Sequence, residues 1–128
     1  MDSLTSVEQI FVLLVAFQIK HYAADYPLQG PYMLRKAHAD HSFVCPLLLH
    51  CGVHAVMTLA IVAKVDISMW WLAVVDGVAH FSMDRVKAGP RYLGRFNDAS
   101  RRSFWNCIGL DQMFHHLTHY LIIWILVT

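Results

Sequence analysis

Hydrophobic positions along the chain gather into four long segments, separated by one tight turn and two polar connections. The segments cover about residues 4–26, 43–65, 67–86 and 104–127. Each is about 20 residues long, which is the length of helix that crosses the hydrocarbon core of a bilayer. The chain is also short enough to form one domain. The pattern therefore predicts a single all-α domain over residues 1–128, folded as a four-helix transmembrane bundle.

Charged residues are scarce and unevenly placed. They make up 15% of the chain, while apolar residues make up 57%; a typical soluble domain has about 25% charged residues. A soluble helical bundle is the alternative, but each of its helices should carry a charged outer face. Here the polar residues fall on narrow stripes of otherwise apolar segments, which is typical of membrane helices with a function at the polar positions. The composition therefore favours the membrane protein.

The placement of lysine and arginine predicts an orientation. Of the ten basic residues, only Lys20 and Lys64 lie away from the two polar connections, about residues 27–42 and 87–103, and their edges. By the positive-inside rule, both connections face the cytoplasm and both termini face outward. The first residues lack the basic region of a signal peptide, so we expect the first apolar segment to be a retained helix.

Each of the four segments carries a pair of histidine or aspartate residues spaced four apart. The pairs are His21 and Asp25, His50 and His54, His80 and Asp84, and Asp111 and His115. Residues four apart lie one turn above each other on one helix face, so both members of a pair can reach the same point. Counted along the helices from the basic connections, all four pairs lie at a similar depth near the cytoplasmic face. The sequence therefore predicts eight ligand-type side chains in one layer.

Five histidines and three aspartates in one layer are the ligands that a site for two divalent metal ions needs. Zinc, manganese and iron all suit such ligands, and zinc is the first choice for hydrolysis. The three cysteines form no CxxC pair and predict neither a thiolate site nor a disulfide framework. For any single pair, the alternative is a hydrogen bond that only holds two helices together. Four pairs at one depth favour metal, because ionisable groups inside a membrane are costly.

Two further residues are candidates for catalysis. Asp76 lies one turn before His80, where it is expected to orient a ligand, bind the metal or carry a proton. Arg85 stands on the basic connection beside the site with Lys87, Arg91 and Arg95, and these cations can hold a phosphate. Contact with anionic lipid headgroups explains the same cations equally well.

Three polar residues near the pairs are candidates for a supporting role. Gln18 lies one turn before His21 and is expected to border the same cavity. His119 lies one turn beyond His115 and is expected to lie behind the ligands. His116 points away from His115 by more than a quarter turn, and a hydrogen bond between helices explains it as well as a supporting role does.

The two halves of the chain resemble each other, and the whole resembles a known family. An HxxxD segment, a basic connection and a second pair-bearing segment occur twice, which is consistent with two pseudo-symmetric helical hairpins. The ordered motifs are HxxxD followed by PLQ (21–29), LLLHxxxH (47–54), HxxxDRxK (80–87) and LDQxxHH (110–116). Together they resemble an uncharacterised family of small, His- and Asp-rich integral membrane proteins of bacteria and phages. The resemblance implies a multi-pass membrane protein, often phage-encoded, without an established activity. The localisation we expect is the bacterial inner membrane, with both termini outside.

These observations lead to one main functional hypothesis and several alternatives. The main hypothesis is a membrane-embedded, metal-dependent hydrolase acting on a phosphoester or phosphoanhydride at the cytoplasmic face. Metal or proton transport or sensing is the first alternative, but the outer halves of three segments are nearly all apolar, which favours a one-sided pocket. A phage accessory protein with structural metals and a di-iron oxidase are the others. The expected partners are the lipid bilayer and an anionic phosphate-containing substrate, with no nucleic acid polymer; monomer and homodimer both stay open.

Overall fold

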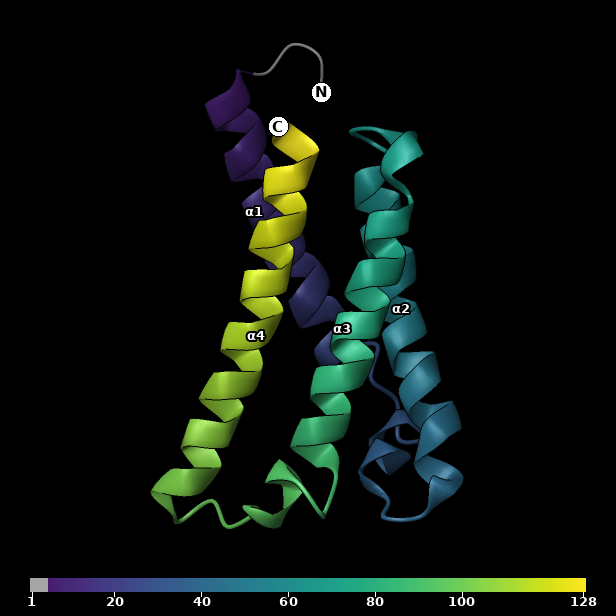
Figure 1. Cartoon of the computed structure of the whole chain (residues 1–128), viewed down its shortest axis with the longest axis vertical. Helices are drawn as coiled ribbons and strands as arrows, with labels where there is room; N and C mark the ends of the chain where they lie inside the picture. The colour runs from purple at the N-terminus through teal and green to yellow at the C-terminus, as the bar shows by residue number, and fades with distance from the viewer. Residues whose placement is uncertain (1–4) are drawn as a thin grey trace.

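Four long helices run alternately down and up in the computed structural model, which describes residues 5–128. They are α1 (Ser6–Asp25), α2 (Val44–Val62), α3 (Trp71–Ala88) and α4 (Arg102–Val127). The C-terminus and the start of α1 lie at the same end as the turn between α2 and α3, and the two long connections lie at the other end (Figure 1). The predicted all-α fold with four helices is confirmed. The predicted start of the first helix, at residue 4, lies outside the described residues.

Local signals in the sequence fix the helix ends. Thr5 caps α1: its hydroxyl accepts a hydrogen bond from the Glu8 backbone N–H at 3.4 Å, and the Glu8 carboxylate accepts one from the Thr5 N–H at 2.9 Å. This reciprocal arrangement satisfies two N–H groups that the helix start would leave free. Pro46 lies in the first turn of α2. Backbone N–H groups in a first turn have no partner within the helix, so the missing N–H of proline costs nothing there. Gly89 ends α3 and Pro90 follows it.

Short 3₁₀ helices shape the connections. They are η1 (Met33–Ala37), η2 (His41–Phe43), η3 (Ile67–Met69) and η4 (Leu93–Arg95). The third long helix was predicted to begin near residue 67; instead, η3 occupies this stretch and α3 begins at Trp71, because the Asp66 carboxylate accepts the Ser68 N–H at 2.8 Å and holds a tight turn. In the second long connection, a Cβ added at Gly94 would lie 2.6 Å from the Ala88 carbonyl oxygen, so this turn requires glycine.

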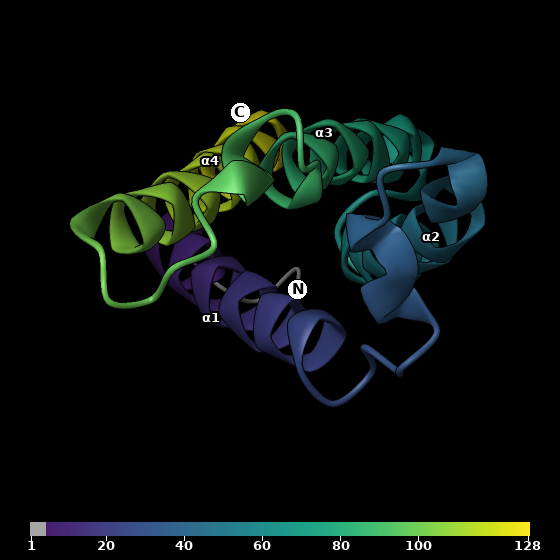
Figure 2. The same ribbon diagram turned by 90° about the horizontal axis from the view of Figure 1, so that it is seen from below.

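The helices pack unequally. α2 packs most extensively against α3, and a Cβ added at Gly77 would lie 3.3 Å from the Ala55 Cβ, so the two backbones approach closely there. This contact joins the two predicted hairpins, α1 with α2 and α3 with α4, across their boundary. Seen from the end with the long connections, the segment between α3 and α4 bridges those two helices (Figure 2).

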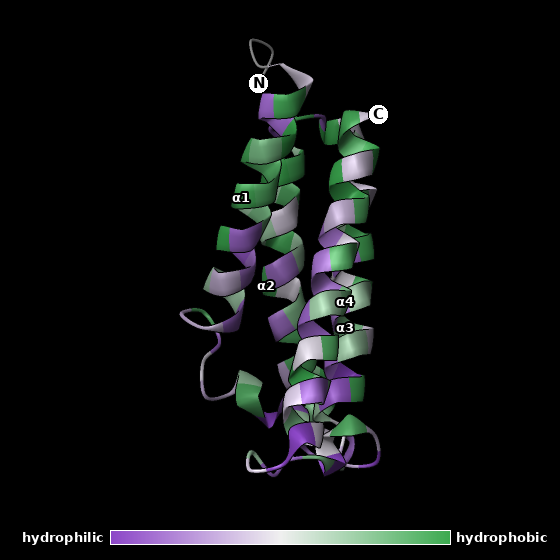
Figure 3. Cartoon of the chain, turned by 90° about the vertical axis from the view of Figure 1, so that its left-hand side faces the viewer, coloured by the Kyte–Doolittle hydropathy of each residue, from purple (hydrophilic) through white to green (hydrophobic). Residues whose placement is uncertain are grey.

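The interior is divided into an apolar part and a polar part. Near the chain ends, seven buried residues from all four helices form an apolar cluster, which we call the apolar plug: Leu13, Phe17, Val62, Leu72, Ile122, Ile123 and Leu126. Toward the long connections the buried side chains also include histidine, aspartate, lysine and threonine. Figure 3 shows long hydrophobic stretches on the helices, with hydrophilic positions more frequent toward the connections.

In the part of the chain that the structure describes, one helix, His41–Val62 including its 3₁₀ turn, is long and apolar enough to cross a membrane. Length and composition are the only criteria met, and the core helix of a soluble protein meets them too. The predicted transmembrane bundle is therefore not confirmed and stays a prediction.

Candidate metal centre

The four predicted pairs meet in the interior of the bundle. Seven of their eight side chains are buried, and Asp25 is half-buried. The rings of His54 and His80 have centroids 3.8 Å apart, and those of His80 and His115 are 4.2 Å apart. The ring of His21 lies 5.4 Å from that of His115. Helices α1 to α4 thus contribute histidines to one cluster, as the spacing and depth of the pairs predicted.

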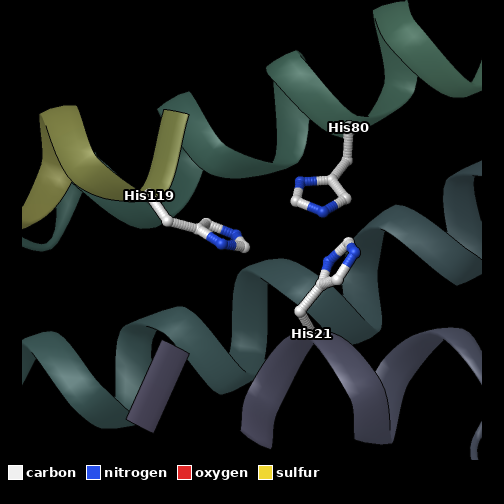
Figure 4. Close-up of side chains that lie close together, drawn as sticks. All are labelled: His21, His80 and His119. Atoms are coloured by element: carbon white, nitrogen blue, oxygen red, sulfur yellow. The ribbon is translucent and has the colours of Figure 1, made fainter. Parts of the chain in front are cut away.

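The first group of potential ligands consists of three histidines from three helices: His21 on α1, His80 on α3 and His119 on α4. One ligand atom of each lies within 4.8 Å of the others, and the rings face a common space (Figure 4). Each of the three rings also has one buried nitrogen without a hydrogen-bond partner. A buried polar atom without a partner is rare and costly, and a shared ligand could satisfy these three nitrogens.

Hydrogen bonds fix the tautomers of two histidines. His80 Nδ1 lies 2.9 Å from the Asp76 carbonyl oxygen, and His115 Nδ1 lies 2.9 Å from the Asp111 carbonyl oxygen. A carbonyl oxygen only accepts, so both Nδ1 atoms carry the proton in these bonds. The lone pair of each neutral ring is then on Nε2, which is buried and has no hydrogen-bond partner. Both rings therefore present a lone pair that could bind a metal ion.

Three more groups of three residues have ligand atoms within 4.8 Å of one another. They are His21, Asp25 and His54; His54, Asp76 and His80; and Asp84, Asp111 and His115. The first two share members with the three-histidine group, so one ion at this place could use any of the three ligand sets. The group of Asp84, Asp111 and His115 shares none, and the short contact between His80 and His115 joins it to the others. This arrangement can hold two ions next to each other.

His50 lies between the two ligand groups. Its Nε2 is 3.3 Å from Asp25 Oδ1 and 3.2 Å from Asp84 Oδ2, and the side chain is fully buried. It therefore links a carboxylate of one group to a carboxylate of the other. Among the described residues it belongs to no group of three, so its predicted role as a ligand rests on the sequence alone.

Asp76 holds two of the histidines in place. Its Oδ1 lies 3.3 Å from His80 Nδ1 and 3.3 Å from His119 Nε2. The opposite nitrogens of these rings, His80 Nε2 and His119 Nδ1, are the ones without a partner. A carboxylate behind a metal-binding imidazole fixes its orientation and tautomer. Of the three roles predicted for Asp76, this geometry supports the orienting one.

A buried lysine, which sequence reasoning did not assign to the site, balances the charge of Asp76. Lys20 Nζ lies 2.6 Å from Asp76 Oδ2, with the two side chains 2% and 0% exposed. Thr58 donates a second hydrogen bond to the same oxygen at 2.7 Å. The sequence contains a signal for this contact: a lysine inside an apolar helix indicates an acidic partner, because a buried charge needs one.

Two more lysines lie at the end of the cluster that faces the long connections. Lys36 is hydrogen-bonded to Asp84 at 2.5 Å, and Lys87 to Asp111 at 2.7 Å. A cavity of about 290 Å³ borders the cluster there and is lined by both lysines, with Asp25, Gln29, Asp84 and Gln112 among its other walls. This cavity, which we call the polar cavity, combines cations with candidate metal ligands, so an anion that enters it meets both. The sequence had indicated Lys36 only as part of a basic connection.

Arg85, predicted as catalytic, turns away from the cluster. Its guanidinium lies 3.5 Å from the centroid of the Phe43 ring and donates a hydrogen bond to the His38 carbonyl oxygen at 3.1 Å. Consecutive helix residues point about 100° apart, so Arg85 cannot share the direction of Asp84. The prediction is corrected: Arg85 braces the first long connection against α3.

Gln18 and His116 belong to none of the ligand groups, although the His116 ring lies 5.5 Å from that of His21, and His119 lies within the cluster. The Gln18 side-chain nitrogen and His116 Nδ1 are 2.9 Å apart on the exposed side of α1 and α4. The predicted role of Gln18 as a wall of the cavity is therefore wrong, and His116 makes the hydrogen bond between helices that was its alternative. His119, predicted to stand behind the ligands, is fully buried among them. Gln112, which the LDQxxHH motif contains but to which sequence reasoning gave no role, lies 3.1 Å from His21 Nε2.

The neighbouring histidines of α4 give a matched test. We expect His119→Ala to lower the affinity for zinc by at least about 10- to 100-fold, which is the loss seen when a residue that orients a metal ligand is removed. His116→Ala should leave the affinity unchanged. Competition with a fluorescent zinc chelator measures both values. Equal losses in the two variants would contradict the assignment of His119 to the cluster.

Comparison with known proteins places the chain in a family. It belongs to the family described as Protein of unknown function (DUF3307), which matches residues 13–128 and therefore includes every residue of the cluster. The resemblance to an uncharacterised family is thus confirmed. No curated protein and no solved structure matches the chain.

Proposed function

We propose that this protein is a membrane-embedded, metal-dependent hydrolase with a dinuclear His/Asp centre, acting on a phosphoester or phosphoanhydride. The observation that carries the proposal is the meeting of buried, unpartnered imidazole nitrogens from four helices with a separate group of Asp84, Asp111 and His115. Two adjacent divalent ions supply an activated water and stabilise the charge of the attacking and leaving oxygens. Zinc is the first choice for the ions, and manganese and iron also suit the ligands.

The distribution of apolar side chains supports a place in the membrane. The outer faces of the helices expose large apolar residues: Phe11 is 69% exposed, Val56 67%, Val78 61% and Trp124 63%. The interior, by contrast, buries four charged residues and six histidines: Lys20, Asp76, Asp84, Asp111, His21, His50, His54, His80, His115 and His119. Water would oppose the exposed apolar surface, while a bilayer stabilises it, and buried ionisable groups of this kind are typical of functional sites inside membrane proteins. We therefore propose a multi-pass protein of the bacterial inner membrane, with the basic connections in the cytoplasm.

The residues around the cluster divide the chemical work. Asp76 orients His80 and His119, and Lys20 neutralises the charge of Asp76. Lys36 and Lys87 line the polar cavity, where they can bind the phosphate oxygens of a substrate. The cavity thus places an anionic substrate beside the ligands of both ions. A site with purely structural metals needs no such cavity.

The apolar plug argues against transport. It lies between the cluster and the end of the bundle that carries the C-terminus, and it contains residues from all four helices. A pathway for ions needs polar groups or water along its whole length, because an unsolvated charge in an apolar interior is very costly. The cluster is therefore approached from the side of the long connections, as a hydrolase acting on cytoplasmic or interfacial substrates requires.

Lys87 and Arg85 provide a test of the phosphate-binding role. We expect Lys87→Met to lower kcat/KM for p-nitrophenyl phosphate by about 10- to 100-fold, the value of one or two charge-assisted hydrogen bonds. Arg85→Met, two residues away but turned toward Phe43, should keep the activity. Steady-state kinetics on zinc-loaded protein in mild detergent measures both.

Two controls complete this test. Lys87→Arg keeps the charge and should retain most of the activity, and circular dichroism shows whether the variants stay folded. Native protein that binds zinc but hydrolyses no phosphomonoester or phosphoanhydride would refute the proposed activity. Equal activity in Lys87→Met and the native protein would refute the role of Lys87.

A further inference from the structure

A second, mostly apolar cleft adjoins the polar cavity. It has a volume of about 360 Å³ and is lined by residues of the segment that bridges α3 and α4 and of the first turns of α4. Its apolar walls include Leu93, Phe96, Phe104, Cys107 and Ile108. Lys36, Asp84 and Lys87 line both hollows. The two spaces therefore meet at the lysines, with carboxylates and cations on one side and hydrocarbon on the other.

From this juxtaposition we infer that the substrate is a phosphate-bearing amphiphile. Its phosphate lies between Lys36 and Lys87 beside the metal cluster, and its hydrocarbon chain lies in the cleft along Phe104 and Cys107. The inference rests on the proposed function, since it names the substrate class of the same site. A small soluble phosphate would use the lysines but would leave the apolar walls without a partner.

Charge distinguishes this cleft from the two apolar grooves between α2 and α3. The groove lined by Ala55, Val56, Leu59, Ile67 and Trp70 has no charged residue in its walls, and neither has the neighbouring groove near Gly52 and Phe81. Such grooves fit the general contact of a helix bundle with lipid chains. At the cleft beside α4, two lysine ammonium groups stand at the inner end, so an anionic headgroup is recognised there.

The position of the cleft also suits a ligand that comes from the bilayer. It lies at the end of the bundle with the long connections, where Tyr92 and Trp105 are 53% and 60% exposed. Exposed tyrosine and tryptophan are typical of the membrane–water interface. A headgroup at this level reaches the lysines while its chain remains beside the helices.

Cys107 offers a direct test, because its thiol lines the apolar cleft but not the polar cavity. In a Cys45→Ser/Cys51→Ala background, Cys107 is the single thiol of the chain. The protein is kept in a detergent that carries no phosphate and labelled with a maleimide, with or without the phosphonate analogue of phosphatidic acid, which phosphatases cannot hydrolyse. We expect the analogue to slow labelling about tenfold when it fills about nine-tenths of the sites.

Four comparisons define the result. Diacylglycerol and methylphosphonate should each leave the labelling rate unchanged, since each has only one half of the amphiphile. Lys36→Met/Lys87→Met should abolish the protection. In Asn106→Cys/Cys107→Ser the thiol stands at the neighbouring exposed position. Its labelling rate should be the same with and without the analogue.

The inference is overturned if the analogue does not slow labelling, if diacylglycerol or methylphosphonate slows it equally, or if the Asn106→Cys thiol is protected to the same extent. The measurement needs no turnover, so it separates this inference from the proposed activity. Protection of Cys107 in a protein without hydrolase activity would leave the binding site standing and refute the reaction. Hydrolysis of soluble phosphomonoesters by a protein whose Cys107 is not protected would support the reaction and refute the amphiphile-binding site.

Discussion

Asp84→Asn is expected to remove one of two bound metal ions and to lower phosphoester hydrolysis by at least about 100-fold. Asp84 is 4% exposed and forms a group of three potential ligands with Asp111 and His115. Asparagine keeps the shape of the side chain but loses the negative charge that a divalent ion requires. Elemental analysis of the purified protein gives the metal content, and the same preparations give the rate.

Asp98→Asn is the matched control for this change. Asp98 lies in the second long connection, where hydrogen bonds from Ser100 lower the pKa of its carboxyl group, and an ion pair to Arg101 at 3.1 Å adds to this effect. The side chain is 52% exposed and borders neither hollow. Its removal should change neither metal content nor rate. Two metal ions per chain in Asp84→Asn would contradict the dinuclear site as we have assigned it.

Lys20→Met is expected to destabilise the bundle strongly. Lys20 and Asp76 are 2.6 Å apart and almost fully buried. Methionine fills much the same volume, but it leaves the Asp76 carboxylate without its cation. Removing one partner of a buried ion pair lowers the free energy of unfolding by about 3–5 kcal/mol. Denaturant titration in mild detergent, followed by circular dichroism, measures this loss.

A second substitution tests whether the unpaired charge is the cause. In Lys20→Met/Asp76→Asn the buried charge is gone, so the double variant should regain a large part of the lost stability. Lys64→Met, at an exposed position in the turn after α2, should change the free energy of unfolding by less than about 0.5 kcal/mol. An unfolding curve of Lys20→Met that matches that of Lys64→Met would show that the ion pair does not stabilise the bundle.

The helices and the His/Asp pairs could be predicted from the sequence because both are local patterns. The apolar runs predicted four helices, and the spacing of residues such as His80 and Asp84 predicted that each pair shares one face. Counting from the basic connections then predicted the common depth, and the structure brings the pairs together. The start of α3 was displaced because the turn chemistry of Asp66 and Ser68 competes with the helix.

The contacts that sequence reasoning did not find join residues far apart in the chain. Lys20 and Asp76 are separated by 56 positions, and Lys36 and Asp84 by 48. No local spacing indicates which lysine meets which carboxylate, because that depends on how the helices pack. Arg85 was misassigned for the opposite reason: it is next to Asp84 in the chain, but helix geometry turns it toward Phe43.

The apolar plug has an electrical consequence. Across an energised membrane, the voltage falls mainly over the least polarisable part of a protein, and here that part is the plug formed by residues such as Leu13, Phe17 and Ile122. Moving one elementary charge through the whole field changes its free energy by about 2.3 kcal/mol per 100 mV. In the proposed membrane orientation, metal ions and phosphates that reach the cluster from the cytoplasmic side would cross little of that field. Their binding should therefore be nearly independent of the membrane potential.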